Sequence, residues 1–340
     1  MVWLKFLLCL AIILFAGTKL ARYGDAIAEK TGLGRIWVGL LFLAIVTSMP
    51  ELVTGVSSAA LVKLPDLALG TLFGSCLFNL FILALLDVLH RHAPILSKAS
   101  PGHMVAAGMG ILLIAVAAGS ILAGERFSGL TLGWVGIPSI LIIILYLVGA
   151  RQIFRFEQKQ QSAPAQPASL RYREISIRTV YLRFALAAIA VIGAGIWLSF
   201  IGDEMAKTTG WDASFVGSLF LAITTSMPEL AVTVAAVRLG AIDMAVADIL
   251  GANMLDMVAI TLADLFYTQG PILFQPRSLV SDAHLTTAIL VVVMNLLVIV
   301  GLRFRQKRKT FKVISWYGPL LVGLYLLGAY ALFASGIGSG

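Results

Sequence analysis

The sequence predicts an all-α integral membrane protein with ten transmembrane helices, arranged as two inverted five-helix repeats. Composition gives the first reason: of the 340 residues, 59% are hydrophobic and only 12% are charged. A soluble domain carries about 25% charged residues. The second reason is a nearly identical apolar segment that occurs once in each half of the chain. The third is the uneven distribution of Lys and Arg among the loops.

Hydropathy divides the chain into ten apolar runs, most of them close to the roughly 20 residues that a helix needs to cross a bilayer. The predicted spans are residues 3–20, 36–61, 66–88, 104–123, 130–149, 180–201, 213–238, 242–266, 283–302 and 314–335. The first run is interpreted as a membrane helix and not as a cleaved signal peptide, because Lys19 and Arg22 follow its apolar core instead of preceding it.

Two five-helix halves are predicted, one at residues 1–150 and the other at residues 180–340. Residues 151–179 between them include a stretch rich in Gln, Ala, Ser and Pro, which is typical of a disordered linker. With the N-terminus outside, this linker is cytoplasmic and 20 of the 25 basic residues lie in cytoplasmic loops. Both termini are therefore expected outside. Because each half has an odd number of spans, the second half enters the membrane in the opposite sense.

The net charge of +8 does not indicate a nucleic-acid partner, because the basic residues gather in short loops between apolar runs. The two cysteines, Cys9 and Cys76, both lie in apolar segments and define neither a disulfide framework nor a metal–thiolate pattern. The expected surroundings are the lipid bilayer, and the sequence indicates no obligate protein partner.

The duplicated segment occupies residues 39–52 and 217–230, and its two copies differ at only two of fourteen positions. Each copy places Thr, Ser and Glu beside a proline inside an apolar run. A charge at membrane depth is costly and usually marks an ion or substrate pathway. A proline also removes a backbone donor and frees the carbonyl four residues earlier. A proline kink that serves helix packing is the alternative interpretation, but it does not explain a glutamate that occurs twice.

The oxygen-bearing side chains of this segment are Thr47, Ser48, Glu51, Thr225, Ser226 and Glu229. An all-oxygen set suits hard cations such as Na⁺ and Ca²⁺, and the absence of His and Cys argues against zinc, copper and iron. The following predicted helix adds Ser75 and Asn79 in the first half and Asp256 in the second. An interhelical hydrogen bond for Asn79 and a structural role for Asp256 are the alternatives. Asp66, Asp87 and Asp243 near predicted span ends are expected to be solvated, to cap helices or to mark membrane boundaries.

With these motifs in place, the chain resembles the sodium/calcium exchanger family, within the cation/calcium antiporter group. The resemblance rests on two inverted repeats, at about 36–88 and 213–266, that carry Thr-Ser-x-Pro-Glu followed by a Gly-Ser-x-x-x-Asn/Asp helix. It implies that Glu51 and Glu229 ligate Ca²⁺ and share in binding Na⁺. It also implies further ion-site oxygens from the side chains of Thr47, Ser48, Thr225, Ser226 and Ser75 and from main-chain carbonyls matching Ala44 and Ala222, with Asn79 and Asp256 as the central polar pair.

The short linker resembles that of prokaryotic members, so the expected location is the prokaryotic inner membrane. The sequence departs from the family pattern at Ala252, where a serine is usual, and at Asp248, where an asparagine is usual. The implied function is a secondary antiporter that exchanges Na⁺ for Ca²⁺ by alternating access, with no cofactor besides the transported ions. Exchange of Ca²⁺ or another cation for H⁺ is the main alternative, because Glu51, Glu229, Asp248 and Asp256 could carry protons. A cation channel and an intramembrane enzyme are less favoured.

Overall fold

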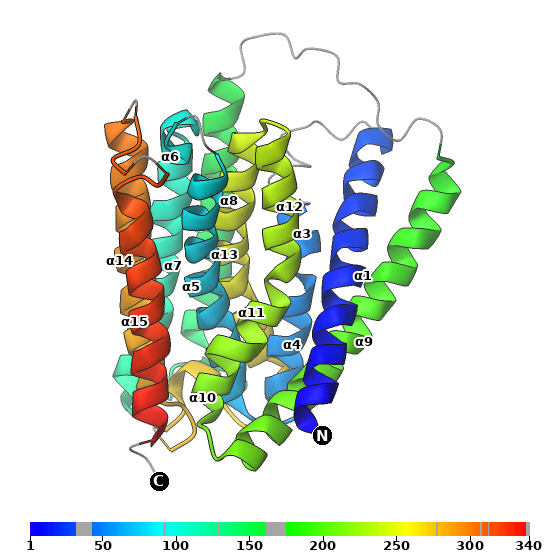
Figure 1. The fold of residues 1–340 in the computed structure, drawn as a ribbon. Helices are drawn as coiled ribbons and strands as arrows, with labels where there is room; N and C mark the ends of the chain where they lie inside the picture. The colour runs from blue at the N-terminus through cyan, green and yellow to red at the C-terminus, as the bar shows by residue number, and fades with distance from the viewer. Residues whose placement is uncertain are drawn as a thin grey trace.

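The computed structural model describes residues 1–31, 43–90, 93–127, 129–160, 175–276, 278–306, 308–311 and 313–337. They form a bundle of long helices that run roughly side by side (Figure 1). The elements are α1 Val2–Thr31, α3 Leu43–Thr47, α4 Met49–Ala60, α5 Pro65–Leu89, α6 Ile95–Lys98, α7 His103–Ala123, η2 Gly124–Phe127, β1 Thr131–Leu132, β2 Val135–Gly136, α8 Ile137–Gln160, α9 Ile177–Thr209, α10 Ala213–Val216, the π-helix η3 Gly217–Leu221, α11 Ala222–Thr225, α12 Met227–Arg238, α13 Ile242–Phe266, η4 Ile272–Phe274, α14 Ala283–Phe304 and α15 Tyr317–Ile337.

Eight of the described helices are long and apolar enough to cross a membrane, and the bent pair formed by residues 213–225 and 227–238 makes a ninth span if it is counted as one. The predicted span at 36–61 falls partly on residues 32–42, which lie outside the described part of the chain. Helices at the periphery expose large apolar side chains such as Leu4, Leu147 and Leu186, as a lipid-facing surface requires. The protein is therefore a multi-pass α-helical membrane protein.

Several predicted boundaries are wrong. α1 continues eleven residues beyond the predicted end at residue 20, to Thr31. The predicted span 130–149 begins too early, because residues 131–136 form a small antiparallel hairpin that turns at Gly133, where φ is 68°. The predicted linker 151–179 includes helical residues at both of its ends. α8 remains helical to Gln160, and α9 begins at Ile177 after Ser176, whose hydroxyl caps the new helix by accepting the Thr179 N–H.

The two copies of the duplicated segment fold alike. α4 and α12 are each 12 residues long, and the helices that follow them, α5 and α13, are each 25 residues long. The residue before α4 is Ser48, with φ −80° and ψ 8°, and the residue before α12 is Ser226, with φ −85° and ψ 6°. Figure 1 shows that the chain runs downward through α3 and α4 but upward through α11 and α12. The two broken helices therefore have opposite directions.

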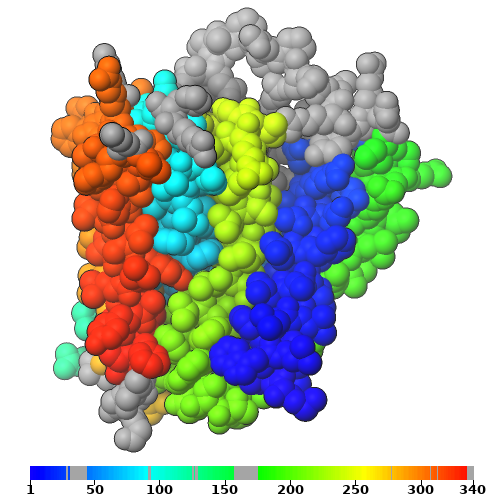
Figure 2. Space-filling model, in the orientation of Figure 1, coloured from blue at the N-terminus to red at the C-terminus, as the bar shows by residue number. Residues whose placement is uncertain are grey.

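α5 and α13 lie at the centre of the bundle, where most of their side chains are buried. α1 and α9 pack against each other in opposite directions beside this core. Lys5 of α1 and Glu204 of α9 form an ion pair at 2.6 Å, and the Cys9 thiol donates to the Ala194 carbonyl at 3.2 Å. The space-filling view shows α1 on one flank of the molecule and α15 on the opposite flank, with α10 to α12 between them (Figure 2).

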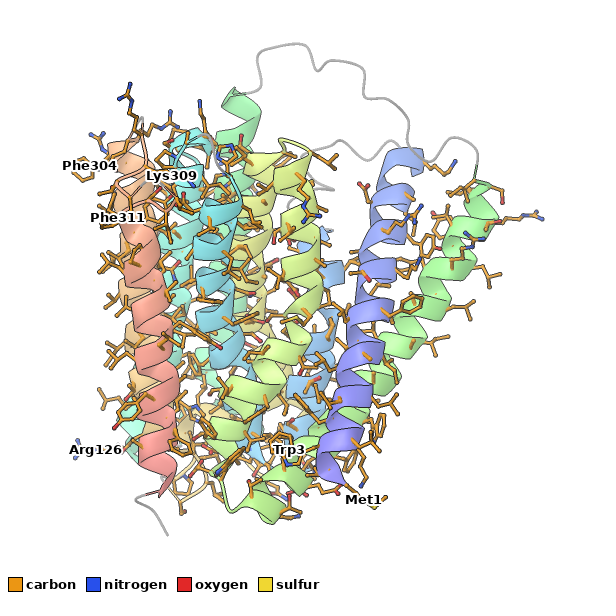
Figure 3. All side chains as sticks on the ribbon, in the orientation of Figure 1. Met1, Trp3, Arg126, Phe304, Lys309 and Phe311 are labelled. Atoms are coloured by element: carbon orange, nitrogen blue, oxygen red, sulfur yellow. The ribbon has the colours of Figure 1, made fainter. Side chains whose placement is uncertain are left out.

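α1 begins and α15 ends at the same end of the bundle, whereas α8 ends and α9 begins at the other (Figure 1). Figure 3 places Met1, Trp3 and Arg126 at the first end and Lys309 at the second. The indole of Trp3 makes an edge contact with that of Trp211 at a centroid distance of 5.9 Å. This contact joins the start of α1 to the residues just before α10.

Candidate cation-binding site

The site is formed where the two broken helices meet. Each helix stops at a serine and restarts with a proline at its second residue, because proline has no N–H to donate to the preceding turn but fits the first turn of a new helix. Glu51 and Glu229 therefore lie in the first turns of α4 and α12. The second broken helix bends by 42° at Ser226 and contains the π-helical turn η3 just before the break. Such turns are often found at functional sites.

Close packing of α5 against η3 brings the broken helix to the centre of the bundle. A Cβ atom on Gly217 would lie 2.6 Å from the main-chain oxygen of Leu67, and one on Gly70 would lie 2.8 Å from that of Ser214. Because glycine has no Cβ, the two backbones can approach this closely. The polar face of α5 is thereby held against the residues that precede Glu229.

The serine of each half hydrogen-bonds to the glutamate of the other half. Ser226 Oγ donates to Glu51 Oε1 at 2.8 Å, and Ser48 Oγ donates to Glu229 Oε1 at 3.2 Å. Glu51 is 1% exposed and Glu229 is fully buried. The two carboxylates also lie within electrostatic range of each other. Residues that are about 180 positions apart in the sequence thus share one buried site.

The predicted threonines line the same site. Thr225 Oγ1 lies 3.5 Å from Ser75 Oγ of α5, again joining the two halves. The hydroxyls of Thr47 and Thr225 each donate to a main-chain oxygen three residues earlier, that of Ala44 or Ala222, both at 3.2 Å. These two carbonyl oxygens occupy equivalent positions before the two helix breaks. Both halves thus offer the same order of carbonyl, hydroxyl and carboxylate oxygens.

The predicted central pair, Asn79 and Asp256, is buried on α5 and α13. Asp256 Oδ2 accepts a hydrogen bond from the Cys76 thiol at 3.5 Å, and Asn253 Nδ2 donates to the Cys76 carbonyl at 3.3 Å. Neither Asn79 nor Asp256 is directly hydrogen-bonded to another predicted site residue within the described part of the chain. Asp256 is, however, in electrostatic range of both glutamates.

Many of the buried polar atoms here have no hydrogen-bond partner among the described residues. They are Glu51 Oε2, Glu229 Oε2, Asp248 Oδ2, Asp256 Oδ1 and both amide atoms of Asn79. An unpartnered buried carboxylate oxygen is costly, and a bound cation removes that cost. No group of three His, Cys, Asp or Glu side chains with metal-binding geometry occurs among the described residues. A cation here would therefore complete its coordination with hydroxyl, amide and main-chain oxygens, as hard cations do.

The predicted site set omits three residues that the structure brings to the site: Asp248, Cys76 and Asn253. Asp248 Oδ1 lies 3.4 Å from Thr47 Oγ1. The sequence does contain a signal for it, because Asp248 precedes Asp256 by eight residues and two helical turns place both on one face of α13. Cys76 and Asn253 gave no such signal, because only the crossing of α5 and α13 makes them neighbours.

A buried, oxygen-lined site between two oppositely directed broken helices is typical of membrane carriers of cations. The sequence profile of the family described as sodium/calcium exchanger protein matches residues 1–151 and 179–336. The chain belongs to this family, whose members are exchangers and not enzymes. It is 26% identical to the inner membrane protein YrbG of Escherichia coli over 269 residues, which cover 77% of this chain and 79% of YrbG.

Solved structures show the same fold. The sodium-calcium exchanger NCX_Mj matches with a TM-score of 0.61 and 21% identity over 97% of this chain and 99% of that one. The H⁺/Ca²⁺ exchanger CAX matches with a TM-score of 0.71 and 14% identity over 99% of this chain and 85% of that one. The fold is thus found in proteins described as exchanging either Na⁺ or H⁺ for Ca²⁺, and family membership assigns this chain to the cation/Ca²⁺ antiporters.

Proposed function

We propose that the protein is a secondary antiporter that exchanges Na⁺ for Ca²⁺ across the membrane. The observation that carries the proposal is the pair of reciprocal hydrogen bonds, Ser226 to Glu51 and Ser48 to Glu229, which join two buried carboxylates from opposite halves in one site. Each carboxylate keeps one oxygen without a partner among the described residues. Two carboxylates match the charge of one Ca²⁺ or of two Na⁺ ions.

The ligands proposed for the transported ions are the set predicted from the sequence. Glu51 and Glu229 would bind Ca²⁺, while their neighbouring hydroxyl and carbonyl oxygens would complete Na⁺ coordination. Because the same carboxylates serve both ions, Ca²⁺ and a full set of Na⁺ cannot bind together. The proposed ligands are Ala44, Thr47, Ser48, Glu51, Ser75, Asn79, Ala222, Thr225, Ser226, Glu229 and Asp256. Mutual exclusion of the two ions is what couples their movements.

Alternating access is proposed to come from movement of α1 and α9 past the site. They pack against each other as a pair, and each has a glycine against the core. Gly17 of α1 faces Pro228 of α12, whereas Gly195 of α9 faces Val53 and Thr54 of α4. No side-chain carboxylate of the described site lies on these two helices, so they can move without displacing a bound ion's ligands.

We further propose ten membrane helices in two inverted halves, residues 1–150 and 180–340, with the intervening segment cytoplasmic and both termini outside the inner membrane. The opposite directions of α4 and α12 support the inverted arrangement (Figure 1). The excess of basic residues in the loops assigned to the cytoplasm supports the orientation. A cysteine inserted after Met1 or in the linker, in a Cys9→Ser, Cys76→Ser background and tested with an impermeant thiol reagent in intact cells, would check it.

The deciding experiment is ⁴⁵Ca²⁺ uptake into Na⁺-loaded proteoliposomes that are diluted into Na⁺-free buffer at fixed pH. Wild type is compared with Glu51→Gln and Glu229→Gln. Ser58→Ala is the matched control, because Ser58 is a buried hydroxyl on the helix of Glu51 but outside the site. Uptake that requires internal Na⁺, persists in the control and disappears in both Gln variants is expected. Uptake that ignores Na⁺ would overturn the proposal.

Exchange of H⁺ for Ca²⁺ is the second candidate. It is favoured by the likeness of fold to the H⁺/Ca²⁺ exchanger CAX, whose TM-score of 0.71 exceeds that of NCX_Mj. The same proteoliposomes separate the two candidates. Uptake driven by an imposed pH gradient in the absence of Na⁺, and still lost in Glu51→Gln, would establish the proton antiporter.

A further inference from the structure

The two halves of the site differ in charge. α5 presents Thr71, Ser75 and Asn79 at successive turns, and all three side chains are neutral. α13 presents Asp248, Ala252 and Asp256 at the equivalent turns. Residues four apart lie on one face of a helix. The second half therefore replaces two hydroxyls and an amide with two carboxylates separated by a methyl group.

Asp248 is directed at the break between α3 and α4. Its side chain is 1% exposed, and its Oδ1 lies 3.4 Å from Thr47 Oγ1. Thr47 Oγ1 in turn lies 3.2 Å from the Ala44 carbonyl oxygen. The second oxygen, Asp248 Oδ2, has no partner among the described residues. One carboxylate, one hydroxyl and one carbonyl oxygen thus lie close together at the break between α3 and α4.

Asp248 and Asp256 add two carboxylates to the surroundings of the two glutamates. Asp256 is in electrostatic range of both glutamates, and Asp248 is in electrostatic range of Glu229. Among the described residues, no Lys, Arg or His forms an ion pair with any of these four carboxylates. A buried charge without a partner is costly, and a cation at Asp248 would neutralise it.

We propose that Asp248 is a further cation ligand of this transporter and sets its sodium affinity. With Thr47 and the Ala44 carbonyl it binds one hard monovalent cation, replacing the hydroxyl that is missing at Ala252. A single carboxylate with two neutral oxygens matches one positive charge. Ca²⁺, which prefers six to eight oxygens and more than one carboxylate, stays between Glu51 and Glu229. This inference rests on the proposed sodium coupling.

The test is equilibrium binding of ⁴⁵Ca²⁺ to purified, detergent-solubilised protein, with NaCl as competitor at fixed pH and constant ionic strength. In Asp248→Asn, the Na⁺ concentration that displaces half of the Ca²⁺ is expected to rise about tenfold or more, while the Ca²⁺ affinity changes by less than about threefold. Thr71→Val is the matched control. It removes only the hydroxyl of the equivalent residue of α5, which donates to the Leu67 carbonyl of its own helix and not to a site residue.

A second readout is thermal unfolding. Na⁺ is expected to stabilise wild type and Thr71→Val more strongly than Asp248→Asn, whereas Ca²⁺ stabilises all three to a similar extent. Thr47→Val keeps the carboxylate and removes only the hydroxyl, so it should show a smaller loss of Na⁺ competition even if Asp248→Asn folds poorly. Wild-type Na⁺ competition in Asp248→Asn, with weakened competition in Thr47→Val, would overturn this inference alone. If NaCl does not displace ⁴⁵Ca²⁺ from the wild-type protein, both the proposed sodium coupling and this inference are overturned.

Discussion

Asp87 and Asp264 occupy equivalent positions near the ends of α5 and α13, and each accepts a hydrogen bond from the backbone N–H eight residues later. The distances are 2.9 Å from the Ile95 nitrogen to Asp87 Oδ1 and 2.6 Å from the Ile272 nitrogen to Asp264 Oδ1. Both carboxylates are fully buried. The C-terminal ends of the two central helices, which lie at opposite ends of the bundle, are therefore stabilised by the same type of hydrogen bond.

Each of these carboxylates also binds a serine near the start of the last helix of the other half. Ser315 Oγ donates to Asp87 Oδ1 at 2.9 Å, and Ser139 Oγ donates to Asp264 Oδ2 at 2.6 Å. Tyr317 adds a further hydrogen bond to Asp87 at 2.6 Å. These hydrogen bonds hold the outer helices α8 and α15 against the central helices and do not involve the ion-site residues.

Replacement of Asp264 by Ala should therefore lower stability and leave ion selectivity unchanged. The change leaves three buried donors without an acceptor, so a loss of about 2–4 kcal/mol in unfolding free energy is expected. Thermal unfolding in detergent measures it. Asp203→Asn, which breaks only the surface pair with Lys207, is the control and should have little effect. A changed ratio of Na⁺ to Ca²⁺ affinity in Asp264→Ala would contradict this separation of roles.

The reciprocal serines should each contribute to Ca²⁺ affinity. Ser226→Ala and Ser48→Ala remove hydrogen bonds that orient Glu51 and Glu229, and hydrogen bonds to charged groups are worth about 1.5–3 kcal/mol. A decrease in Ca²⁺ affinity of about tenfold or more is expected for each variant. Equilibrium ⁴⁵Ca²⁺ binding measures the effect. Unchanged affinity in both variants would show that the two hydrogen bonds do not position the glutamates.

Transport rate should be sensitive to the glycine of α9 that faces the core. A Cβ on Gly195 would lie 3.0 Å from Val53 Cγ1, whereas a Cβ on Gly193 would meet nothing within 4 Å. Overpacking of this kind typically costs about 1–3 kcal/mol. Gly195→Ala should therefore slow Ca²⁺ uptake while equilibrium Ca²⁺ binding persists, and Gly193→Ala serves as the control on the same helix. Equal uptake rates in the two variants would argue against close passage of α9 along α4.

Cys76 provides a natural probe of access to the site, because its thiol is buried beside Asp256. In a Cys9→Ser background, a water-soluble thiol reagent should modify Cys76 only when the site opens. Ca²⁺ at about 100 times its dissociation constant should slow modification about 100-fold by mass action. Cys9, tested in Cys76→Ser, lies between α1 and α9 and should show no comparable protection. Labelling of Cys76 that is unaffected by Ca²⁺ would place the thiol away from the ion.

Local features of the sequence predicted membrane insertion, the positions of most spans and the polar residues of the duplicated segment. Hydropathy and the effect of Pro50 on its own helix depend only on residues that are close together in the sequence, so the sequence is enough to predict them. The wrong helix boundaries lie where two local signals in the sequence favour different structures. The apolar residues 131–136 form a hairpin because Gly133 turns the chain, and α8 extends through the polar residues 151–160 because helix continuation does not require apolar side chains.

The sequence by itself determined the class of protein and the kind of atoms that a site could offer, since a repeated Thr-Ser-Met-Pro-Glu inside apolar runs has few other uses. Only the tertiary structure decided which of those atoms meet. Ser48 reaches Glu229 across 181 positions, and Asp248 reaches Thr47 across 201. Such pairs depend on the faces that helices present at their crossings. Helix spacing within one segment does not specify those faces, so the approach of Asp248 to Thr47 became visible only in the folded protein.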